Sequence, residues 1–307
     1  MEEMVGIGLA GLSALTTNVG FLLRHRGAVA VEDVDPRHLV HSAVVLFRSK
    51  WWTIGFALAI VAYLLHASAL TLVSLSAIQA VLAAGIVVMA VLAERFFGLE
   101  VGPRQWLGVG LASAGLIGLA LTADVESGQG TTDYDPAAMI GFSAALAGGG
   151  LAALVLGWRA RHGVLLAVAT GLLLTVTHIA FKAASGKADG GPMPVLERPY
   201  VYVVVAGGVV AFFASARSLQ LGPAVPVIAV TAIVGNACAI AAGIVVFGDT
   251  LGSGPVAIVF RVLGFALVVG ASTLIPGPLR AGTIRRRAPA PRQRARRYPA
   301  EPARPAA

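Results

Sequence analysis

Long apolar stretches separated by short polar segments dominate the sequence. The hydrocarbon core of a bilayer is about 30 Å thick, so a helix needs roughly 20 apolar residues to cross it. Stretches of this length recur along the whole chain, and we therefore predict an all-α membrane protein with nine transmembrane helices. The nine predicted spans cover residues 4–23, 51–72, 74–93, 104–122, 137–157, 164–183, 200–219, 223–247 and 254–275.

Basic residues between the spans predict the orientation, because cytoplasmic loops carry an excess of Lys and Arg. One side of the nine spans holds 19 of the 23 basic residues, while the other holds only Lys182, Lys187 and Arg198. This asymmetry predicts a cytoplasmic C-terminus and an external N-terminus. The preference for Arg over Lys indicates a GC-rich bacterial genome, so we expect the protein in the plasma membrane, the bacterial inner membrane.

The two halves of the chain resemble each other. "SALTLVSLSAIQAV" resembles "ARSLQLGPAVPVIAV", "LAERFFGLE" resembles "VVFGDTLGS", and "NVGFLLRHRGA" at the end of the first span resembles "ALVLGWRARHGV" at the end of the fifth. The second and seventh spans, and the third and eighth, match in this way and lie five apart, so they cross the membrane in opposite directions, as in alternating-access transporters. We predict two inverted-topology repeats, of four spans in 1–122 and five spans in 137–279. A duplication in a non-transporting membrane protein is the alternative.

Three segments outside the spans complete the predicted organisation. An acidic external loop at 123–136 separates the repeats. Asp35-Pro36 is a helix-start signal, and it predicts a short interfacial helix over about 36–48, with a vestigial half-span as the alternative. The Arg- and Pro-rich segment 280–307 is predicted to be a disordered cytoplasmic tail. We expect this tail to contact anionic lipid headgroups rather than nucleic acid.

Composition narrows the class of protein. Apolar residues make up 57% of the chain and charged residues only 12%, about half of the roughly 25% that a soluble protein carries. This excludes a soluble enzyme, and the single cysteine excludes a disulfide framework or a Cys-rich metal site. The net charge of +8 lies entirely in 280–307, which holds nine Arg and one Glu. No enzyme motif is present, and we expect neither catalysis nor a cofactor.

A family resemblance rests on the repeated pattern of an Ala/Ser–Leu pair, a short turn, an apolar helix and then Glu or Asp. "ASALTLVSLSAIQAV…LAERF" and "ARSLQLGPAVPV…VVFGD" resemble the drug/metabolite transporter (DMT) superfamily of the EamA type. The nine spans, the external N-terminus and "KWWTIG" resemble its NIPA-type branch, which is linked to magnesium. That branch typically places a carboxylate in the helix that opens with Trp-Trp, whereas this helix offers Tyr63 and His66.

Polar side chains inside the spans are the candidate site, because they are costly in lipid. None of the nine spans contains Asp or Glu, so no metal site is predicted and a histidine would have to carry protons. Arg261 would be a counter-ion for an anionic substrate, or would extend to the interface. The amides would line a cavity or join helices, and lone histidines would otherwise be packing residues. The predicted substrate-binding residues are Asn18, Tyr63, His66, Gln79, His178, Asn236 and Arg261.

Two further patterns concern helix ends and helix packing. Glu94 and Asp249 end helices near the membrane surface; we interpret them as structural, with gates formed with Arg95 or Arg217 as the alternative. A row of small residues on the fourth span predicts tight helix contacts or the seam of a homodimer. The row consists of Gly110, Ala114 and Gly118.

Three functions stay open at this level. We expect a secondary transporter that moves a small organic solute or metabolite by alternating access. A NIPA-like divalent-cation transporter is the second hypothesis, and the absence of carboxylates from the spans disfavours it. A non-transporting scaffold or lipid-interacting membrane protein is the third, and it predicts that no central cavity exists.

Overall fold

Every regular element that the structure describes is an α-helix, which confirms the predicted all-helical fold. The structure is a computed structural model, and its described residues belong to one compact unit, Met1–Gly277. The predicted loop 123–136 lies almost entirely, and the tail 280–307 entirely, outside the described residues. The structure describes residues 2–70, 75–121, 134–185, 199–247 and 255–274.

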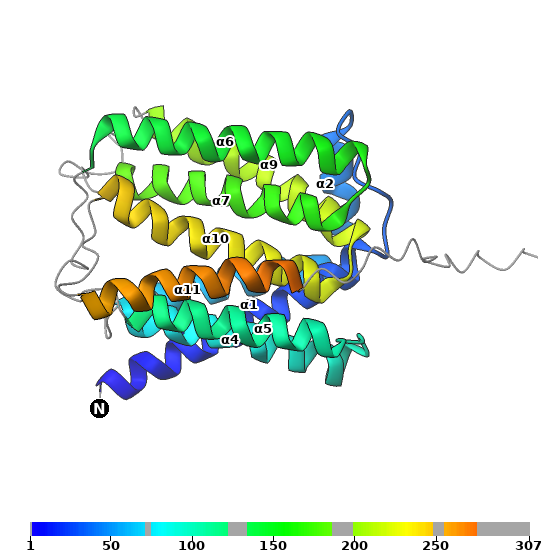
Figure 1. Cartoon of the computed structure of the whole chain (residues 1–307). Helices are drawn as coiled ribbons and strands as arrows, with labels where there is room; N and C mark the ends of the chain where they lie inside the picture. Colours follow the sequence, from blue (N-terminus) through cyan, green and yellow to red (C-terminus); the bar gives the residue numbers. More distant parts are fainter. Residues whose placement is uncertain (1, 71–74, 122–133, 186–198, 248–254, 275–307) are drawn as a thin grey trace, which may run out of the picture. The chain divides into compact units, whose positions relative to one another are not determined.

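Within these ranges, nine long helices coincide in position with the predicted spans, and a shorter helix, α2, follows the first of them (Figure 1). Helices α1 to α5 form the first half of the chain, and α6 to α11 form the second half. The bounds are α1 Glu2–Ala28, α2 Leu39–Arg48, α3 Lys50–Leu70, α4 Leu75–Phe97, α5 Pro103–Leu121, α6 Pro136–Arg159, α7 Gly163–Ser185, α9 Pro199–Leu221, α10 Ala224–Phe247 and α11 Pro255–Leu274.

Several of these helices are long and apolar enough to cross a bilayer. Their outward faces are apolar as well: Ile140, Leu151 and Leu156 of α6 are all exposed, as expected of side chains that contact lipid. A sixth span results if α2 and Lys50–Leu65, which are bent by 94°, count as one. The five candidate spans among the described residues are Met4–Ala28, Pro136–Arg159, Gly163–Ala180, Tyr200–Leu221 and Ala224–Phe247.

Glycines set the closest approach of α1 to α3. A Cβ atom on Gly55 would lie 2.6 Å from the carbonyl oxygen of Gly20, and one on Gly27 would lie 2.4 Å from the backbone nitrogen of Trp52. Because neither position has room for a side chain, the two backbones pack directly against each other. The Ser13 hydroxyl donates to the carbonyl of Ala62 at 2.8 Å, which shows with the glycine contacts that the helices are antiparallel.

Helix α7 makes the corresponding contacts in the second half. At its start, a Cβ on Gly163 would lie 2.4 Å from the backbone nitrogen of Gly222, which follows α9. The Ser218 hydroxyl of α9 donates to the Gly163 carbonyl at 2.8 Å, so α9 ends where α7 begins and the two are antiparallel. Toward α10, the Thr175 hydroxyl donates to the carbonyls of Gly171, at 2.9 Å, and Gly235, at 3.2 Å.

These contacts relate α1 to α7. Helix α1 packs antiparallel to α3 and also against α4, where Asn18 bonds Gly85; α7 packs antiparallel to α9 and also against α10, where Thr175 bonds Gly235. The similarity between the ends of the first and fifth predicted spans pointed instead to α6 as the partner of α1. By packing, α6 is the helix of the second half for which the first half has no counterpart.

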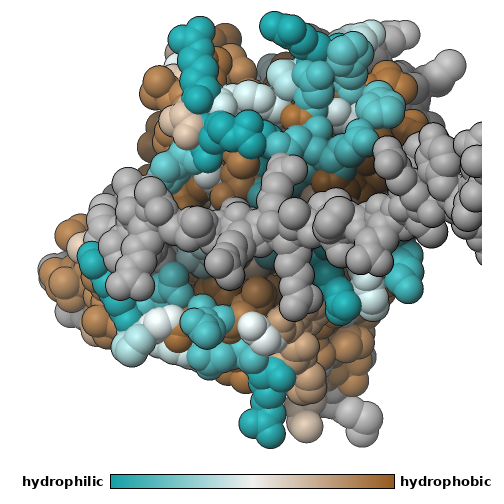
Figure 2. Space-filling view, turned by 90° about the vertical axis from the view of Figure 1, so that its right-hand side faces the viewer, coloured by the Kyte–Doolittle hydropathy of each residue, from teal (hydrophilic) through white to brown (hydrophobic). Residues whose placement is uncertain are grey.

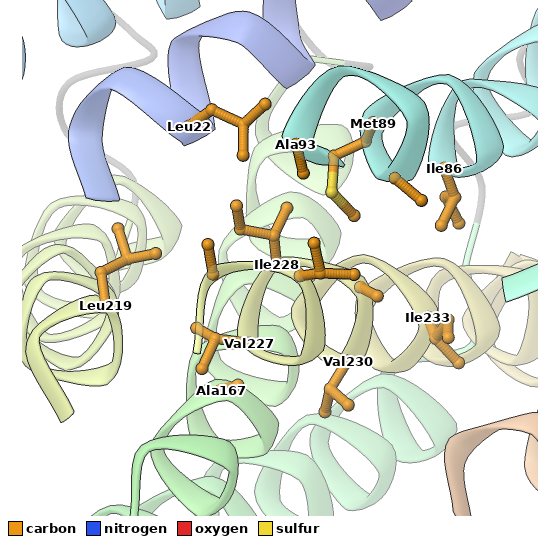
Figure 3. Packing of buried hydrophobic residues seen from close by; sticks show 14 of the residues in the cluster. Leu22, Ile86, Met89, Ala93, Ala167, Leu219, Val227, Ile228, Val230 and Ile233 are labelled. Atoms are coloured by element: carbon orange, nitrogen blue, oxygen red, sulfur yellow. The ribbon is translucent and has the colours of Figure 1, made fainter. Parts of the chain in front are cut away.

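The two halves meet in one large buried cluster. It joins Leu22 and Met89 of α1 and α4 to Leu219 and Ile228 of α9 and α10. Figure 3 shows α10 between α1 and α4 on one side and α7 on the other, with Ile228 toward Leu22 and Ala93. This cluster lies where α1 and α9 end and α3, α7 and α10 begin. We call this end of the helices the inner end, because its basic residues predict that it faces the cytoplasm.

At the opposite, outer end the described buried clusters each belong to a single half. One joins Met139, Ile179 and Val246 of α6, α7 and α10, and the other joins Ala10 to Ala69 of α1 and α3. Among the described residues, the halves are therefore joined by the large cluster at the inner end and by the packing of α5 against α11, where a Cβ on Gly115 would lie 2.7 Å from the Gly264 carbonyl. The outer clusters each stabilise one half.

Candidate functional site

Three of the seven predicted substrate-binding residues lie on helices whose positions are described while their side chains are not. They are His66 of α3, Gln79 of α4 and Arg261 of α11. The predicted roles of these three side chains therefore stay predictions. The structure places the side chains of the other four.

Asn18 lies one helical turn outward from Leu22 of the central cluster. Its Nδ2 donates to the carbonyl oxygen of Gly85 at 2.7 Å, which joins α1 to α4. Gly85 leaves room for this amide, since a Cβ there would lie 3.1 Å from Nδ2. Asn18 therefore has the helix-joining contact that was one of its two predicted roles, at a position just outside the cluster.

Asn236 and His178 lie on helix faces that run outward from the packed interior. Asn236 follows Val225, Ala229 and Ala232 on one stripe of α10 and is half-buried. His178 follows Thr175 by three residues, on the side of α7 that approaches α10 at Gly235. In Gly163–Ala180, His178 is the only exposed residue, and all the others are buried or half-buried. Both polar groups thus lie beyond the cluster toward the outer end.

Tyr63 lies elsewhere. Its side chain is 60% exposed, and the neighbouring Ile60, Val61 and Leu64 of α3 are exposed too. Its surroundings are those of an outward apolar surface, and the recorded contacts of the described residues do not bring it to Asn18, Asn236 or His178. The structure places Asn18 and Asn236 just outside the central cluster, His178 farther out beside Ile179 of an outer cluster, and Tyr63 on an outward face.

A charged network joins the two halves at the inner end. The Asp33 carboxylate, in the connection between α1 and α2, lies 3.0 Å from Nη1 of Arg217 and 3.3 Å from Nη2 of Arg161. Arg217 is on α9 and Arg161 is in the α6–α7 turn, so one carboxylate of the first half binds two guanidinium groups of the second. The Arg217 side chain is only 5% exposed, whereas Asp33 and Arg161 are 42% and 62% exposed.

Gln220 of α9 binds the backbone of the same connection. Its Nε2 donates to the carbonyls of Ala28, at 3.2 Å, and Glu32, at 2.9 Å. Its Oε1 accepts from the backbone N–H of Val34, at 2.9 Å, and from Arg217, at 3.2 Å. The amide thus satisfies three backbone groups that no helix pairs, and it holds residues 28–34 against the second half.

Local backbone conformation positions both sides of the network. Arg161 has φ 52°, a left-handed conformation that costs a non-glycine residue about 1–2 kcal/mol. His162 follows it, and its Nδ1 accepts from the N–H of Leu165 at 3.1 Å, which caps the start of α7. On the other side, Ser42 of α2 accepts from the N–H of Asp35 at 3.0 Å and fixes the end of the connection.

The two arginines shift the acidity of Asp33. Partial burial raises the pKa of this carboxyl, but hydrogen bonds and charge from Arg217 and Arg161 outweigh it and hold the pKa below its ordinary 3.8. The pKa of the exposed Asp35 is also lowered, mainly by the His38 ring at 3.0 Å and the N–H of Arg37. Asp33 is therefore ionised, and its ion pairs are intact, at any pH near neutrality.

Hydrophilic residues gather over this end of the helices (Figure 2). Some of them line a hollow of about 210 Å³ beside the network, in which Nε2 of His41 lies 3.7 Å from Oε2 of Glu32. Within the described part of the chain, no group of three or more His, Cys, Asp or Glu side chains could hold a metal ion. The hollow is lined by Glu32, Asp33, Asp35, His38, His41, Ser42 and Val45.

Asp33 and Gln220 were missed as functional candidates from the sequence. The alternative gates predicted for Glu94 and Asp249 paired them with Arg95 or Arg217. Asp249 lies outside the described residues, and the structure pairs Arg217 with Asp33. One available signal was the acidic group Glu32, Asp33 and Asp35 within the segment 24–50, which also holds five basic residues. Sequence separation hid the pair, because its members are 184 positions apart in the chain.

Comparison with known proteins gives one partial similarity. The chain is 27% identical over 119 residues to the probable magnesium transporter NIPA9 of Arabidopsis thaliana, a match that covers 39% of this chain. The matched part spans 33%, or about a third, of the length of that protein. No family model and no solved structure matches the chain. The long apolar helices indicate a multi-pass membrane protein.

Proposed function

We propose that the protein is a secondary transporter that moves a small organic solute across the plasma membrane by alternating access. One observation carries the proposal: α1 with α3 and α4 packs as α7 does with α9 and α10, at corresponding hydrogen bonds. Helices five apart in a chain that crosses the membrane at each one have opposite directions, and inverted units of this kind place a substrate site between them.

The proposed site lies just beyond the inner cluster, between the two units. Asn18 and Asn236 come from the first and second halves, and His178 borders the same region on α7. Amide and imidazole groups form hydrogen bonds to polar organic solutes without a full charge in the membrane. His66, Gln79 and Arg261 belong to the proposal as predicted, and Arg261 would then bind an anionic group of the solute.

Magnesium transport is the second candidate, and it is favoured by the similarity to the plant protein, a probable magnesium transporter. Mg²⁺ prefers carboxylate oxygens or the waters that they hold, and the nine predicted spans contain no Asp or Glu. We therefore prefer an organic solute over this cation.

Uptake by proteoliposomes tests both candidates. The purified full chain would be reconstituted and supplied with radiolabelled amino acids, nucleosides, sugars and organic acids, and in parallel with Mg²⁺ and an internal Mg²⁺ dye. We expect saturable uptake of at least one organic solute, reduced by Asn236→Ala and unchanged by Tyr63→Phe. Saturable Mg²⁺ uptake alone would favour the second candidate, and absence of all uptake would favour a non-transporting protein.

A further inference from the structure

We propose that Asp33, with Arg217, Arg161 and Gln220, is the inner gate of the transporter: a polar lock that joins the halves at the inner end and parts when that end opens. This inference rests on the proposed function and adds the contact that must break. Its first basis is that both ion pairs and the three backbone hydrogen bonds of Gln220 cross from one half to the other.

The second basis is that the first-half partner of the lock is mainly a short connection between helices. The bound residues are Ala28, the last residue of α1, and residues 32–34 of the connection between α1 and α2, a segment without a helix. Releasing Gln220 and the arginines frees this connection without unfolding a helix. The second-half side is rigid by comparison, because Arg217 and Gln220 lie on α9 and Ser218 ties α9 to the start of α7.

The third basis is the strength of the ion pairs, which favours the closed state and still allows it to open. Ion pairs with partly exposed partners contribute little net free energy, because water solvates each group when the pair opens. Asp33 and Arg161 are of this kind, whereas Arg217 is almost fully buried and costs more to separate from its carboxylate. The lock therefore biases the inner end toward the closed state without making the closed state permanent.

The fourth basis is the position of the lock relative to the proposed site. From the inner end outward come the ion pairs, then the cluster of Leu22 and Ile228, and then Asn18 and Asn236. Outer clusters belong to single halves. The structure thus shows the inner end closed, and a solute at the site would leave to the cytoplasm only after the lock and the cluster part.

The single cysteine of the chain tests this proposal. Cys238 is half-buried on α10, two residues beyond Asn236, and so lies on the outer side of the cluster. In oriented proteoliposomes, a membrane-impermeant maleimide would be added on the inner or the outer side. We expect Asp33→Asn to raise the labelling rate of Cys238 from the inner side on the order of tenfold, the effect of losing a half-buried charge pair.

The matched control is Asp35→Asn, two residues away, because the recorded hydrogen bonds of the Asp35 carboxylate stay within its own connection. Its labelling rate should equal that of the wild type. Reversal of all three charges, with Asp33→Arg, Arg161→Asp and Arg217→Asp, should return labelling from the inner side toward the wild-type rate. Arg161→Gln keeps the ion pair between Asp33 and Arg217, so its labelling rate should be intermediate. It replaces Asp33→Asn in the test if Asp33→Asn does not fold.

The gate is overturned if Cys238 in folded Asp33→Asn is labelled from the inner side at the wild-type rate. If Asp33→Asn does not fold, the same result in Arg161→Gln overturns it. The failure of the gate differs from the failure of the proposed function. Solute uptake with unchanged labelling would leave a transporter whose gate lies elsewhere. Labelling that responds to Asp33→Asn without uptake of any solute would show an opening inner end in a protein that is not this transporter.

Discussion

At the scale of single residues, glycines decide how closely the helices approach. The spacing of Gly110, Ala114 and Gly118 predicted a packing face on α5, but the close contact is at Gly115, where a Cβ would lie 2.7 Å from the carbonyl of Gly264 on α11. A Cβ on Gly110 has no described neighbour within 4 Å. Periodicity identifies a face of small residues, whereas the face that meets another helix depends on tertiary contacts that sequence spacing does not contain.

Substitution of Gly55 tests the contact between α1 and α3. Gly55→Ala would place a methyl group 2.6 Å from the Gly20 carbonyl, and we expect a loss of stability of about 1–3 kcal/mol from the forced separation. Gly8→Ala is the matched control, because a Cβ there meets no described atom, and alanine favours a helix by about 0.5–1 kcal/mol. Thermal unfolding in detergent would measure both, and equal midpoints would contradict the packing.

Asn18 gives a second prediction at this scale. Asn18→Ala removes the hydrogen bond to the Gly85 carbonyl, and bonds between membrane helices contribute about 0.6–2 kcal/mol. We expect a stability loss in that range together with reduced solute uptake. Thr17→Ala, one position along α1, is the control. Unfolding in graded sodium dodecyl sulfate would measure the loss, and wild-type values for both stability and uptake would contradict a role for Asn18.

The third prediction concerns pH. The pKa of folded Asp33 is lowered below 3.8, so its ion pairs stabilise the protein fully above that pH and are lost as the pH falls through the folded pKa. The groups facing it are Arg161 and Arg217, with Glu32 and His41 beside it. The difference in unfolding midpoint between wild type and Asp33→Asn should be constant from pH 7 to about pH 4 and should shrink below it. A difference that grows in acid would contradict this sign.

At the scale of elements, helix positions followed from the sequence because bilayer thickness fixes the length of an apolar span. The pairing of elements did not. Both α1 and α6 end in basic residues at the inner end, and their similar sequences reflect the side of the membrane rather than the helices that they contact. The packing relates α1 to α7, which only contacts such as Asn18–Gly85 and Thr175–Gly235 reveal.

Helix α2 illustrates the same limit. Asp35-Pro36 predicted a start near 36, whereas the helix begins at Leu39 after a turn in which the Asp35 carboxylate accepts from the N–H of Arg37. Its bend of 94° from α3 agrees with an orientation along the membrane surface. The exposed Val40 and Val44 would then face the lipid, whereas the Phe47 ring packs against Phe56 of α3 and Phe212 of α9.

A fluorescent label tests the orientation of α2. In a Cys238→Ala background, an environment-sensitive dye on Val40→Cys should emit at shorter wavelength in vesicles than the same dye on His41→Cys, because only the former would enter the apolar boundary. The effect should grow when anionic lipid is added, since basic residues flank the helix. Equal emission from both positions would contradict an interfacial helix.

At the scale of the whole molecule, the proposed site follows from where the two halves touch. The seven polar residues could be selected from the sequence because polar groups are costly inside a span. Their separation into Asn18, Asn236 and His178 near the interior and Tyr63 on an outward face required the fold. The inner lock was beyond sequence reasoning, since Asp33 and Arg217 meet only when the halves pack.

Alternating access is the central claim, and distances between spin labels test it most directly. In a Cys238→Ala background, one pair of spin labels at the exposed Met4 and Ile140 would report the outer end, and a second pair at Phe96 and Leu156 the inner end. The distances would be measured by double electron–electron resonance in nanodiscs. We predict that Asp33→Asn or a transported solute lengthens the inner distance while the outer distance shortens. Both distances unchanged under every condition would contradict a protein whose halves rock about a shared site.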